Sequence, residues 1–532
     1  MSVIPKQNGA KLFRVWPDCP QSQWDAIVVG SGMGGLSCAA ALANQGNRVL
    51  VLERHFVPGG YTHMFARKEF EWDVGVHAIG EMRPCDVPRK ILDWLTAGSV
   101  EMEPLGDPYD RFHFPDEFNI DFPSTRKGFR ESLITSFPEQ QDKIDAYLKL
   151  VRKVSKYSQL FYACKSLPFG LARILTWVQH LFYRDWWGMT TSEVFDELGI
   201  EGRLRLVLAG QWGYIGETVD RSSFPVQALV QSHFRNGAWY PVGGAKVFAE
   251  GMLAQIRAAG GECVVRAEVS EVLEKGNRVV GVKLADGTEI PANKVISAAG
   301  AKTTVGKLVS EKLRTSRWGQ EILSIQDSPS YLCLNLGFKG DIAKAGASRA
   351  NRWFFRTWEE TTQYWNAEDS EEKAPILYVS FPSLKNPKHN SGPEGIQTGE
   401  CVTFVPWDLF ERWRESEYGN RSEDYKLFKE ALKERMLSQL REVIPDVMQH
   451  MVYADLSTPL SASHFANASQ GAIYGLAATP DRYGCSALRS RTPLRGLHLT
   501  GVDPFSLGVV GAMMAGCLTA ASLDWRIYRR LI

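Results

Sequence analysis

The chain has 532 residues, of which 61 are Lys or Arg and 60 are Asp or Glu, so its formal net charge is only +1. This balance argues against nucleic acid as a partner, because nucleic-acid-binding surfaces carry a clear excess of positive charge. Apolar residues make up 44% and charged residues 23%, which excludes a disordered chain and is typical of a globular one.

The nine cysteines are scattered and form no Cys-x-x-Cys pair, which argues against a disulfide framework and a zinc site, and we expect no bound metal. The segment before Asp25 holds no apolar run long enough for a secretory signal, and no charge-free apolar run of about 18 residues occurs later. We therefore expect a cytoplasmic protein, either free or resting on the cytoplasmic face of a membrane.

The chain opens with the pattern strand, helix, strand. Asp25 to Val29 is a short apolar run closed by glycine, Leu36 to Ala43 is a small-residue helix followed by a glycine stop, and Val49 to Leu52 is a second apolar run. Runs this apolar are typical of buried parallel strands. The sequence therefore predicts a βαβ unit at the start of the folded chain.

Between the first strand and the helix, Gly30-Ser31-Gly32-Met33-Gly34-Gly35 fits G-x-G-x-x-G. The first glycine permits a tight turn, the second lets backbone approach a pyrophosphate, and the third lets the helix pack on the strand. Glu53 ends the second strand, where a carboxylate can bind both ribose hydroxyls of an adenosine. Because glycine-rich turns are common, it is the combination of turn, flanking elements and acid that predicts a dinucleotide site.

Two later motifs favour FAD over NAD. Pro58-Gly59-Gly60 supplies further backbone donors to a pyrophosphate soon after Glu53. In LHLTGVD, Asp503 ends a strand on the flavin side, and the helix that begins near Gly508 directs its N-terminal dipole at a flavin ring. The sequence shows no second G-x-G-x-x-G between a strand and a helix, so we expect a separate electron donor, whose identity stays open, in place of a dedicated NAD(P)H domain.

The middle and the end of the chain contain further sheet elements. Glu262 to Ile290 alternates β-branched and charged residues around two glycine turns, which predicts a meander of hairpins. Lys294 to Ala301 predicts another buried strand, and Gly496 to Trp525 repeats the order strand, loop and helix. Ser422 to Val443 is charged and helix-like.

The opening VVGSGMGGLSCAAALANQGNRVLVLE, the following PGGYTHMF and FEWDVGVHAIGEM, and the closing GLHLTGVDPFSLGVVGAMMAG resemble the phytoene desaturase and amine oxidase class of FAD enzymes, and within it the retinol saturase group. The similarity extends through FPEQQDKIDAYLKLV, GAWYPVGGA, FPSLKNP and TPLSASHFANASQGAIYG, nearly the whole chain from Trp24 to Leu523. It implies an α/β fold: a Rossmann-type FAD-binding lobe assembled from discontinuous segments, plus a mixed α+β substrate lobe. It also implies action on the C=C bonds of long apolar polyenes.

The order of motifs divides the chain between these two lobes. The FAD-binding lobe is expected to comprise residues 24–83, 232–327 and 461–525, and the substrate lobe a helical part, residues 84–231, and a second part, residues 328–460. By position in the motifs, the resemblance implies coenzyme contacts from Gly30, Gly32, Met33, Gly34, Gly35, Glu53, Arg54, Gly59, Gly60, Tyr61, Thr62, Val269, Ala299, Gly501, Asp503, Val509 and Val510.

Saturation of an alkene by a reduced flavin needs a hydride from the flavin and a proton from an acid of the protein. The candidate catalytic acids are His77, in the flavin-proximal motif, and Tyr474, just before the closing motif, with His464 and Glu81 behind them. Each has an alternative: His77 as a residue that fixes a loop, Tyr474 as an aromatic wall of the pocket, and His464 as a satisfied histidine. Asp73 is expected to cap a turn near the flavin.

A polyene is almost insoluble in water, so we expect the protein to collect it from a bilayer. Residues 165–187 mix Trp, Phe, Leu and Ile with Lys165, Arg173 and Arg184, which is typical of an interfacial helix. The alternative is a core helix of the substrate lobe. Trp525 to Ile532 is either a second membrane contact or a frayed tail.

The favoured function is the reduction of a C=C bond in a retinoid- or carotenoid-like lipid by flavin hydride transfer. A desaturase or a cis–trans isomerase using the same FAD site is an alternative, and the mass of the product separates the three. A non-catalytic flavin- or lipid-binding protein is an alternative of another class. A monoamine oxidase is disfavoured, because no cysteine matches that family's flavin-attachment motif.

Overall fold

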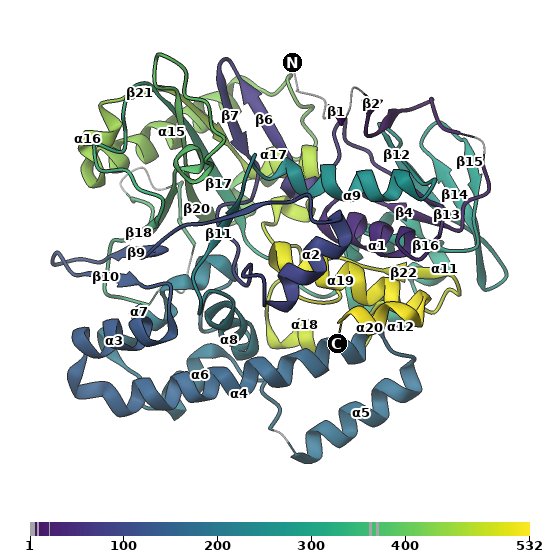
Figure 1. Cartoon of the computed structure of the whole chain (residues 1–532), viewed down its shortest axis with the longest axis horizontal. Helices are drawn as coiled ribbons and strands as arrows, with labels where there is room; N and C mark the ends of the chain where they lie inside the picture. Colours follow the sequence, from purple (N-terminus) through teal and green to yellow (C-terminus); the bar gives the residue numbers. More distant parts are fainter. Residues whose placement is uncertain are drawn as a thin grey trace.

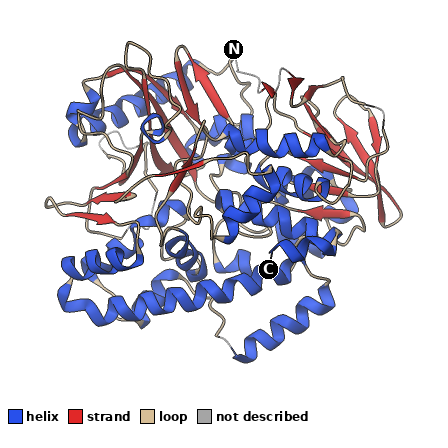
Figure 2. Ribbon diagram, in the orientation of Figure 1, coloured by secondary structure: helices blue, strands red, loops and turns tan. Residues whose placement is uncertain are grey.

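The computed structural model describes residues 6–7, 10–20, 22–182, 184–360, 364–368 and 372–531. Two lobes lie side by side, one built on a parallel sheet (right in Figure 1) and one on a larger, mostly antiparallel sheet (left in Figure 1). Helices cover the first sheet and gather below the second, and the long α4 (Gln141–Ser166) runs beneath both lobes (Figure 2).

The six-stranded sheet has the order β22-β16-β4-β5-β12-β3, and all its neighbours are parallel. Its strands are buried on both faces, because helices α1, α2, α9 and α19 cover one face and the three-stranded sheet β13-β14-β15 covers the other. The elements of this lobe are β3 (Arg14–Val15), β4 (Ala26–Val29), α1 (Met33–Ala43), β5 (Val49–Leu52), α2 (Val87–Thr96), α9 (Lys246–Ala258), β12 (Glu262–Val265), β13 (Val269–Lys275), β14 (Arg278–Leu284), β15 (Glu289–Pro291), β16 (Val295–Ser297), β22 (Leu497–Leu499) and α19 (Gly508–Leu523).

The predicted elements of this lobe are confirmed. β4, α1 and β5 form the expected βαβ unit, and β13, β14 and β15 pair antiparallel as the expected meander. β16 and β22 are the two further buried strands, and α15 (Glu423–Val443) in the other lobe is the expected charged helix. Strands from three remote parts of the chain thus meet in one sheet.

The second sheet has the order β10-β9-β18-β19-β20-β17-β21, antiparallel except between β9 and β18. Its strands alternate: Leu332, Leu334 and Leu336 of β17 pack in the core that contains α15, and the intervening residues face the first lobe. The strands are β9 (Asp110–His113), β10 (Asn119–Phe122), β17 (Ser330–Phe338), β18 (Asn351–Phe355), β19 (Ile376–Ser380), β20 (Gln397–Val405) and β21 (Met451–Ser457).

The expectation that residues 84–231 form a helical part of the substrate lobe needs two corrections. β9 and β10 lie in this segment and form one edge of the seven-stranded sheet, because alternate residues such as Phe112 and Phe122 turn into the core. In addition, α2 packs with α1 and α9 in the core of the first lobe, so it does not belong to the substrate lobe.

The other strands are β1 (Lys6–Gln7), β2 (Ala10–Lys11), β6 (Met64–Arg67), β7 (Phe70–Asp73), β8 (Met102–Pro104) and β11 (Trp239–Pro241). The other helices are α3 (Arg126–Ser136), α5 (Phe169–Phe182), α6 (Thr191–Glu197), α7 (Gly202–Ala209), α8 (Phe224–His233), α10 (Ala301–Thr303), α11 (Glu311–Arg314), α12 (Arg317–Leu323), α13 (Pro382–Lys385), α14 (Asp408–Glu411), α16 (Pro445–Met448), α17 (Pro459–Ala466), α18 (Pro480–Gly484) and α20 (Tyr528–Leu531). Across the part of the chain that the structure describes, none of the helices has the length and apolarity needed to cross a membrane.

The contact between α1 and α19 depends on the absence of a side chain at Gly516. A Cβ there would lie 2.4 Å from the carbonyl oxygen of Gly34 and 2.8 Å from the amide nitrogen of Cys38. We expect Gly516→Ala to lower the free energy of unfolding by about 1–3 kcal/mol, because backbone must move to admit the methyl group.

Thermal unfolding measures this change, and Gly170→Ala in α5 is the matched control. A Cβ at Gly170 meets nothing within 4 Å, so alanine there is expected to be neutral or stabilising by up to about 1 kcal/mol. Equal unfolding temperatures for the two variants would contradict the packing described here.

Candidate functional site

A cavity of about 570 Å³ lies between the two sheets and is lined by residues from both lobes. In the first lobe it lies beyond the carboxyl ends of β4, β5, β16 and β22, the edge at which open α/β sheets bind their ligands. All but two of the expected coenzyme contacts line it, namely Gly30, Gly32, Met33, Gly34, Gly35, Glu53, Arg54, Gly60, Tyr61, Thr62, Val269, Ala299, Gly501, Asp503 and Val509.

Three glycines of the turn after β4 each serve a different purpose. Gly30 adopts φ +98°, a left-handed backbone that favours glycine, and a Cβ on Gly35 would lie 2.1 Å from the carbonyl oxygen of Gly30. Gly32 differs, because a Cβ there meets nothing within 4 Å. Gly32 therefore leaves open space on the cavity side, where a phosphate group can approach the backbone.

Glu53 is held at the end of β5 by the neighbouring backbone. Its Oε2 accepts hydrogen bonds from the amide nitrogen of Ser31 at 2.8 Å and from Ser31 Oγ at 2.6 Å, and its Oε1 accepts one from the amide of His55 at 2.7 Å. The carboxylate is thereby fixed beside the glycine turn and still lines the cavity. A ribose lying along this edge would find an acceptor already in position.

Asp503 joins three segments of the chain. Its Oδ2 accepts a hydrogen bond from the amide of Ala301 at 2.7 Å and its Oδ1 one from the amide of Leu476 at 3.0 Å. The side chain is buried and at the same time lines the cavity. It was predicted as a coenzyme contact, and it also serves as a structural clamp that the sequence did not indicate.

Two helices direct their first turns at the cavity without a side-chain cap. The residues before them, Gly32 for α1 and Leu507 for α19, make no capping hydrogen bond through a side chain. Gly508 and Val509 of α19 line the cavity together with Met33 of α1. The open N–H groups of a helix N-terminus bind anions and electron-rich oxygens, so both ends suit a dinucleotide that carries phosphates and a flavin ring.

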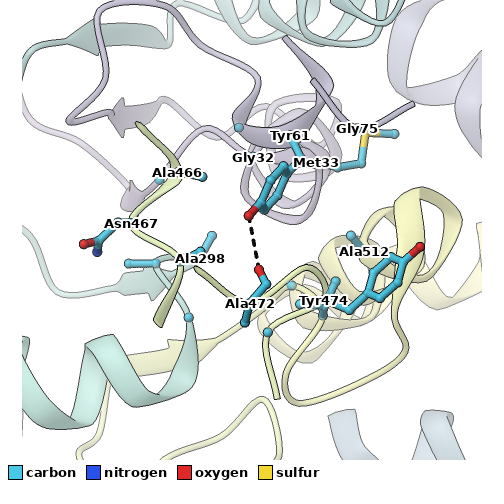
Figure 3. Close-up of a pocket in the computed structure, with 18 of the residues that line it drawn as sticks. Gly32, Met33, Tyr61, Gly75, Ala298, Ala466, Asn467, Ala472, Tyr474 and Ala512 are labelled. Carbon is cyan, nitrogen blue, oxygen red and sulfur yellow. Dashed lines mark hydrogen bonds between the residues drawn. The ribbon is translucent and has the colours of Figure 1, made fainter. Parts of the chain in front are cut away.

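The part of the cavity formed by the second lobe is aromatic. The wall residues are Tyr214, Tyr331, Cys333, Trp353, Tyr378, Val402 and Phe404. The sheet register sets Trp353 opposite Tyr378, Tyr378 opposite Val402 and Tyr331 opposite Phe404, so these side chains share one face of the sheet. Figure 3 shows Tyr61 beside Gly32 and Met33, with its hydroxyl directed to the carbonyl oxygen of Ala472, 3.1 Å away.

Both predicted catalytic acids, His77 and Tyr474, line the cavity. Nδ1 of His77 lies 2.8 Å from Oε2 of the buried Glu400, and its ring packs edge-on against Tyr378 at 5.3 Å. The ring of Tyr474 lies against Gly216, where a Cβ would come within 2.5 Å of it. Burial raises the pKa of the Tyr474 hydroxyl, which therefore keeps its proton at neutral pH.

The structure places the other predicted residues away from the cavity lining. The amide of Gly59 donates to the carbonyl oxygen of Ser31, so Gly59 shapes the turn, and Val510 packs in the core of the first lobe. Glu81 lies 3.1 Å from Nδ1 of His233, and His464 stacks on Tyr418.

Asp73 also lies outside the lining. It accepts hydrogen bonds from the hydroxyl of Tyr240 and the amide of Ala245, and burial together with nearby Glu400 raises its pKa to about 7. The expected turn cap is thus a buried carboxyl group that holds Tyr240 and the segment after it.

Sequence reasoning missed three buried charged residues next to the aromatic wall: Asp110, Lys385 and Glu400. The available signal was a charge inside an apolar strand, as at Glu400 in the run TGECVTFV. Such a residue is almost never fully buried unless it is paired. The partners, however, are remote along the chain, and only the fold identifies them.

The chain is similar to flavoproteins over most of its length. A family model described as "Flavin containing amine oxidoreductase" matches residues 33–523. An all-trans-retinol 13,14-reductase of Danio rerio is 33% identical and covers 94% of this chain and 85% of its own, and a chloroplastic prolycopene isomerase of Daucus carota is 25% identical and covers 94% and 79%. Among solved structures, putrescine oxidase bound to putrescine matches with a TM-score of 0.63 at 16% identity, covering 95% of this chain and 100% of that one.

These similarities confirm the predicted fold class and the resemblance to the flavoenzyme class that includes retinol reductases and prolycopene isomerases. The family implies a flavin cofactor, and the site fits one. The open space at Gly32, the fixed carboxylate of Glu53 and the uncapped helix ends are what a flavin dinucleotide needs.

We expect Gly32→Val to fold normally and to lose flavin. The backbone φ of −63° at Gly32 suits any L-residue, and a side chain there would project into open space that the coenzyme needs. Flavin affinity should fall by at least about 10-fold, or about 1.4 kcal/mol. The ratio of flavin absorbance to protein in the purified variant, with titration of added coenzyme, measures the loss.

The matched change is Gly35→Ala. Its Cβ would collide with the carbonyl oxygen of Gly30, so this variant should lower the unfolding temperature of the protein as well as its flavin content. A Gly32→Val variant that retains flavin at the wild-type affinity would rule out this turn as the binding site.

Proposed function

Since the chain belongs to the family of flavin-containing amine oxidoreductases, we propose that it is an oxidoreductase that uses FAD to saturate a C=C bond of a long apolar polyene, such as a retinoid or a carotenoid. The observation that carries this proposal is the aromatic wall, which is continuous with the glycine turn in a single cavity. A conjugated chain packs favourably on aromatic side chains. The similarity to a retinol reductase supports the same substrate class.

The choice of FAD rests on the set of elements that line the cavity. The glycine turn, Glu53, Asp503 and the N-terminus of α19 all line it. An extended dinucleotide would contact Gly32 through its pyrophosphate, Glu53 through its adenosine ribose and α19 through its flavin ring. Val269, the first residue of β13, lines the cavity as an adenine contact would require.

Reduced FAD, when bound, supplies a hydride to one carbon of the alkene. The protein residues contribute three things. Trp353, Tyr378 and Phe404 hold the polyene and exclude water. His77 and Tyr474 are the proton donors at the wall, and both face the cavity from elements outside the aromatic sheet. Electrons come from a separate donor, whose binding site we do not assign.

A second candidate function is cis–trans isomerisation of a polyene at the same site. The similarity to a prolycopene isomerase favours it, because that relative also covers 94% of this chain. The same cavity would serve desaturation if hydride moved from substrate to flavin. The three reactions share their substrate class and coenzyme, and the mass of the product distinguishes them.

We propose further that α5 touches a membrane surface. Phe169, Leu171, Ile174 and Trp177 are 58%, 48%, 60% and 63% exposed and form an apolar side, on which Arg489 packs over the ring of Phe169. Arg173 is exposed among them. This pattern suits an interfacial helix. Within the predicted segment 165–187, Trp186 and Trp187 are buried and do not contribute, and the side chains of residues 178–182 lie outside the described residues.

The C-terminal end lies on the same side of the protein. Tyr528 of α20 forms a hydrogen bond of 2.8 Å with Ser166 at the end of α4, and Trp525 is 64% exposed beneath the guanidinium of Arg529. Basic residues beside exposed tryptophan attract anionic lipid headgroups. Because scattered cysteines suit a reducing compartment, the membrane face that we propose is the cytoplasmic one.

The first experiment identifies the product. Protein whose flavin has been photoreduced in the absence of oxygen is mixed with all-trans-retinol or with a carotenoid. The lipid is then extracted, and its molecular mass is measured by mass spectrometry. We expect a product that gains two hydrogens, one molecule for each flavin. His77→Gln and Tyr474→Phe should both retain flavin. Whichever of the two substitutions removes the proton donor should slow the reaction by about 100-fold.

Other products would contradict saturation. An unchanged mass with altered geometry would establish the isomerase, and a loss of two hydrogens with oxidised flavin would establish the desaturase. Flavin that neither accepts electrons nor reacts with any polyene would mean a binding protein.

The membrane contact is tested by sedimentation with vesicles that contain anionic phospholipid. Ile174→Glu should weaken binding by about 10-fold, because it places a charge on the apolar side of α5. Leu427→Glu on α15 is the matched control, since Leu427 is 65% exposed and α15 lies at the opposite end of the molecule from α5 (Figure 1). Equal binding of the two variants would remove α5 from the membrane surface.

A further inference from the structure

Next to the aromatic wall, and on the same face of the seven-stranded sheet, lies a row of polar side chains. Register pairs Asn335 with Glu400, Glu400 with Ser380, and Asn351 with Asp110. Each of these residues is at most 2% exposed. Two residues further along the same strands, a second row of paired residues lines the cavity: Cys333, Val402, Tyr378 and Trp353. We call Asn335, Glu400, Ser380, Asn351 and Asp110 the polar row.

Lys385 of α13 lies over the middle of the polar row and is fully buried. Its Nζ donates to Ser380 Oγ at 2.7 Å, to Asn351 Oδ1 at 2.5 Å and to the backbone carbonyl oxygen of His77 at 2.8 Å. The three donors of the ammonium group are therefore used. Lys385 fixes the backbone at His77 but makes no hydrogen bond to Glu400.

The two acids of the polar row differ in how they are satisfied. Asp110 accepts hydrogen bonds from Gln211 at 2.9 Å, from Tyr214 at 3.0 Å and from Asn351 at 2.9 Å. Glu400 is 0% exposed, and within the described residues neither of its oxygens has a hydrogen-bond partner. A buried carboxylate without donors is costly unless a proton or a cation neutralises it.

The group nearest to Glu400 is the ring of His77. Nδ1 lies 2.8 Å from Oε2, close enough for an ion pair, although the two atoms do not meet in conventional hydrogen-bond geometry. The His77 side chain is 17% exposed and lines the cavity. Because Nδ1 faces Glu400, Nε2 is the ring nitrogen left to serve the cavity.

We infer that His77 and Glu400 form an ion pair at the cavity wall in which His77 carries the proton, and that Glu400 is the positioning residue that keeps the His77 ring cationic. The catalytic part of this inference rests on the proposed function. In that reaction the alkene gains a hydride on one carbon from the reduced coenzyme and a proton on the neighbouring carbon from Nε2 of His77. The imidazole is left neutral, the coenzyme is left oxidised, and an external two-electron reductant and a proton from water restore both.

The other titratable groups that act on Glu400 do not replace His77. They are Asp73 of β7, Tyr240 of β11, Cys333 of β17, Tyr378 of β19 and Lys385 of α13. Burial raises the pKa of Tyr240, Cys333 and Tyr378, which stay neutral, and it raises the pKa of Asp73 to about 7. Asp73 also acts on His77, with the same sign as Glu400.

Lys385 is the only cation in that set. Burial lowers its pKa to about 7, and its three protons point at oxygens other than those of Glu400. A proton on His77 is thus the neutralising charge closest to Glu400. The carboxylate and the imidazolium stabilise each other in a region from which water is excluded.

The test reads the protonation of His77 directly. The full-length, flavin-loaded protein is labelled with ¹⁵N-histidine, and the ring nitrogen resonances of His77 are assigned by their absence from the spectrum of His77→Gln. At pH 7 we expect protons on both ring nitrogens in the wild type and on only one in Glu400→Gln.

The matched control is Glu217→Gln. Glu217 is also a buried glutamate, 1% exposed, but it accepts a hydrogen bond from Tyr364 at 2.6 Å and does not line the cavity. Its substitution should leave the His77 resonances unchanged. A neutral His77 ring in the wild type at pH 7 would overturn the inference, as would a doubly protonated ring in Glu400→Gln.

Single-turnover rates with a polyene then test the positioning role. Glu400→Gln should slow reduction by about 100-fold and change its pH profile, and Glu400→Asp should recover part of the rate. Normal rates in Glu400→Gln would refute that role. If the wild type reduces no polyene, the proposed function fails, whereas the ring nitrogen resonances still show whether His77 is protonated beside Glu400.

Discussion

One buried carboxylate holds together the parts of the chain that form the cavity. Asp503 accepts from the amides of Ala301 and Leu476, and Gly475 runs so close that a Cβ there would lie 2.2 Å from Oδ1. Removing such an acceptor would leave two buried donors unsatisfied, at a cost of about 1–3 kcal/mol each. The start of α10, the loop that carries Asp503 and the segment around Tyr474 are therefore held together at the cavity that all three line.

The two sheets make different contributions because their strands are covered differently. The parallel sheet is enclosed on both faces, so its ligand can lie only at the carboxyl edge, beyond Gly30 and Glu53. The antiparallel sheet packs one face on α15 and leaves the other for the cavity. The cavity thus offers aromatic side chains on the side of the antiparallel sheet and backbone N–H groups on the side of the parallel one.

The first lobe was largely predictable from the sequence, and the second was not. Fully apolar strands and a glycine turn are local signals, so β4, α1 and β5 follow directly from their residues. β9 and β10 are four residues long and lie within a helix-rich segment, and the pairing of β9 with β18 joins strands that are remote along the chain. His77 was predicted from its motif, but Glu400 lies in a strand remote along the chain, and only the tertiary fold brings the two within 2.8 Å.

The polar row itself is an argument that the cavity performs chemistry. Burial of an ion costs several kcal/mol even after relaxation, and a fold that only stored a polyene would be more stable with apolar residues at Glu400 and Lys385. Asp110 is compensated by three hydrogen bonds, so it can be explained by structure alone. Glu400 cannot, because its oxygens lack donors among the described residues and its nearest group is a histidine on the cavity wall. A carboxylate kept at such a cost beside an imidazole that lines the cavity is best explained by the proton that the imidazole can hold.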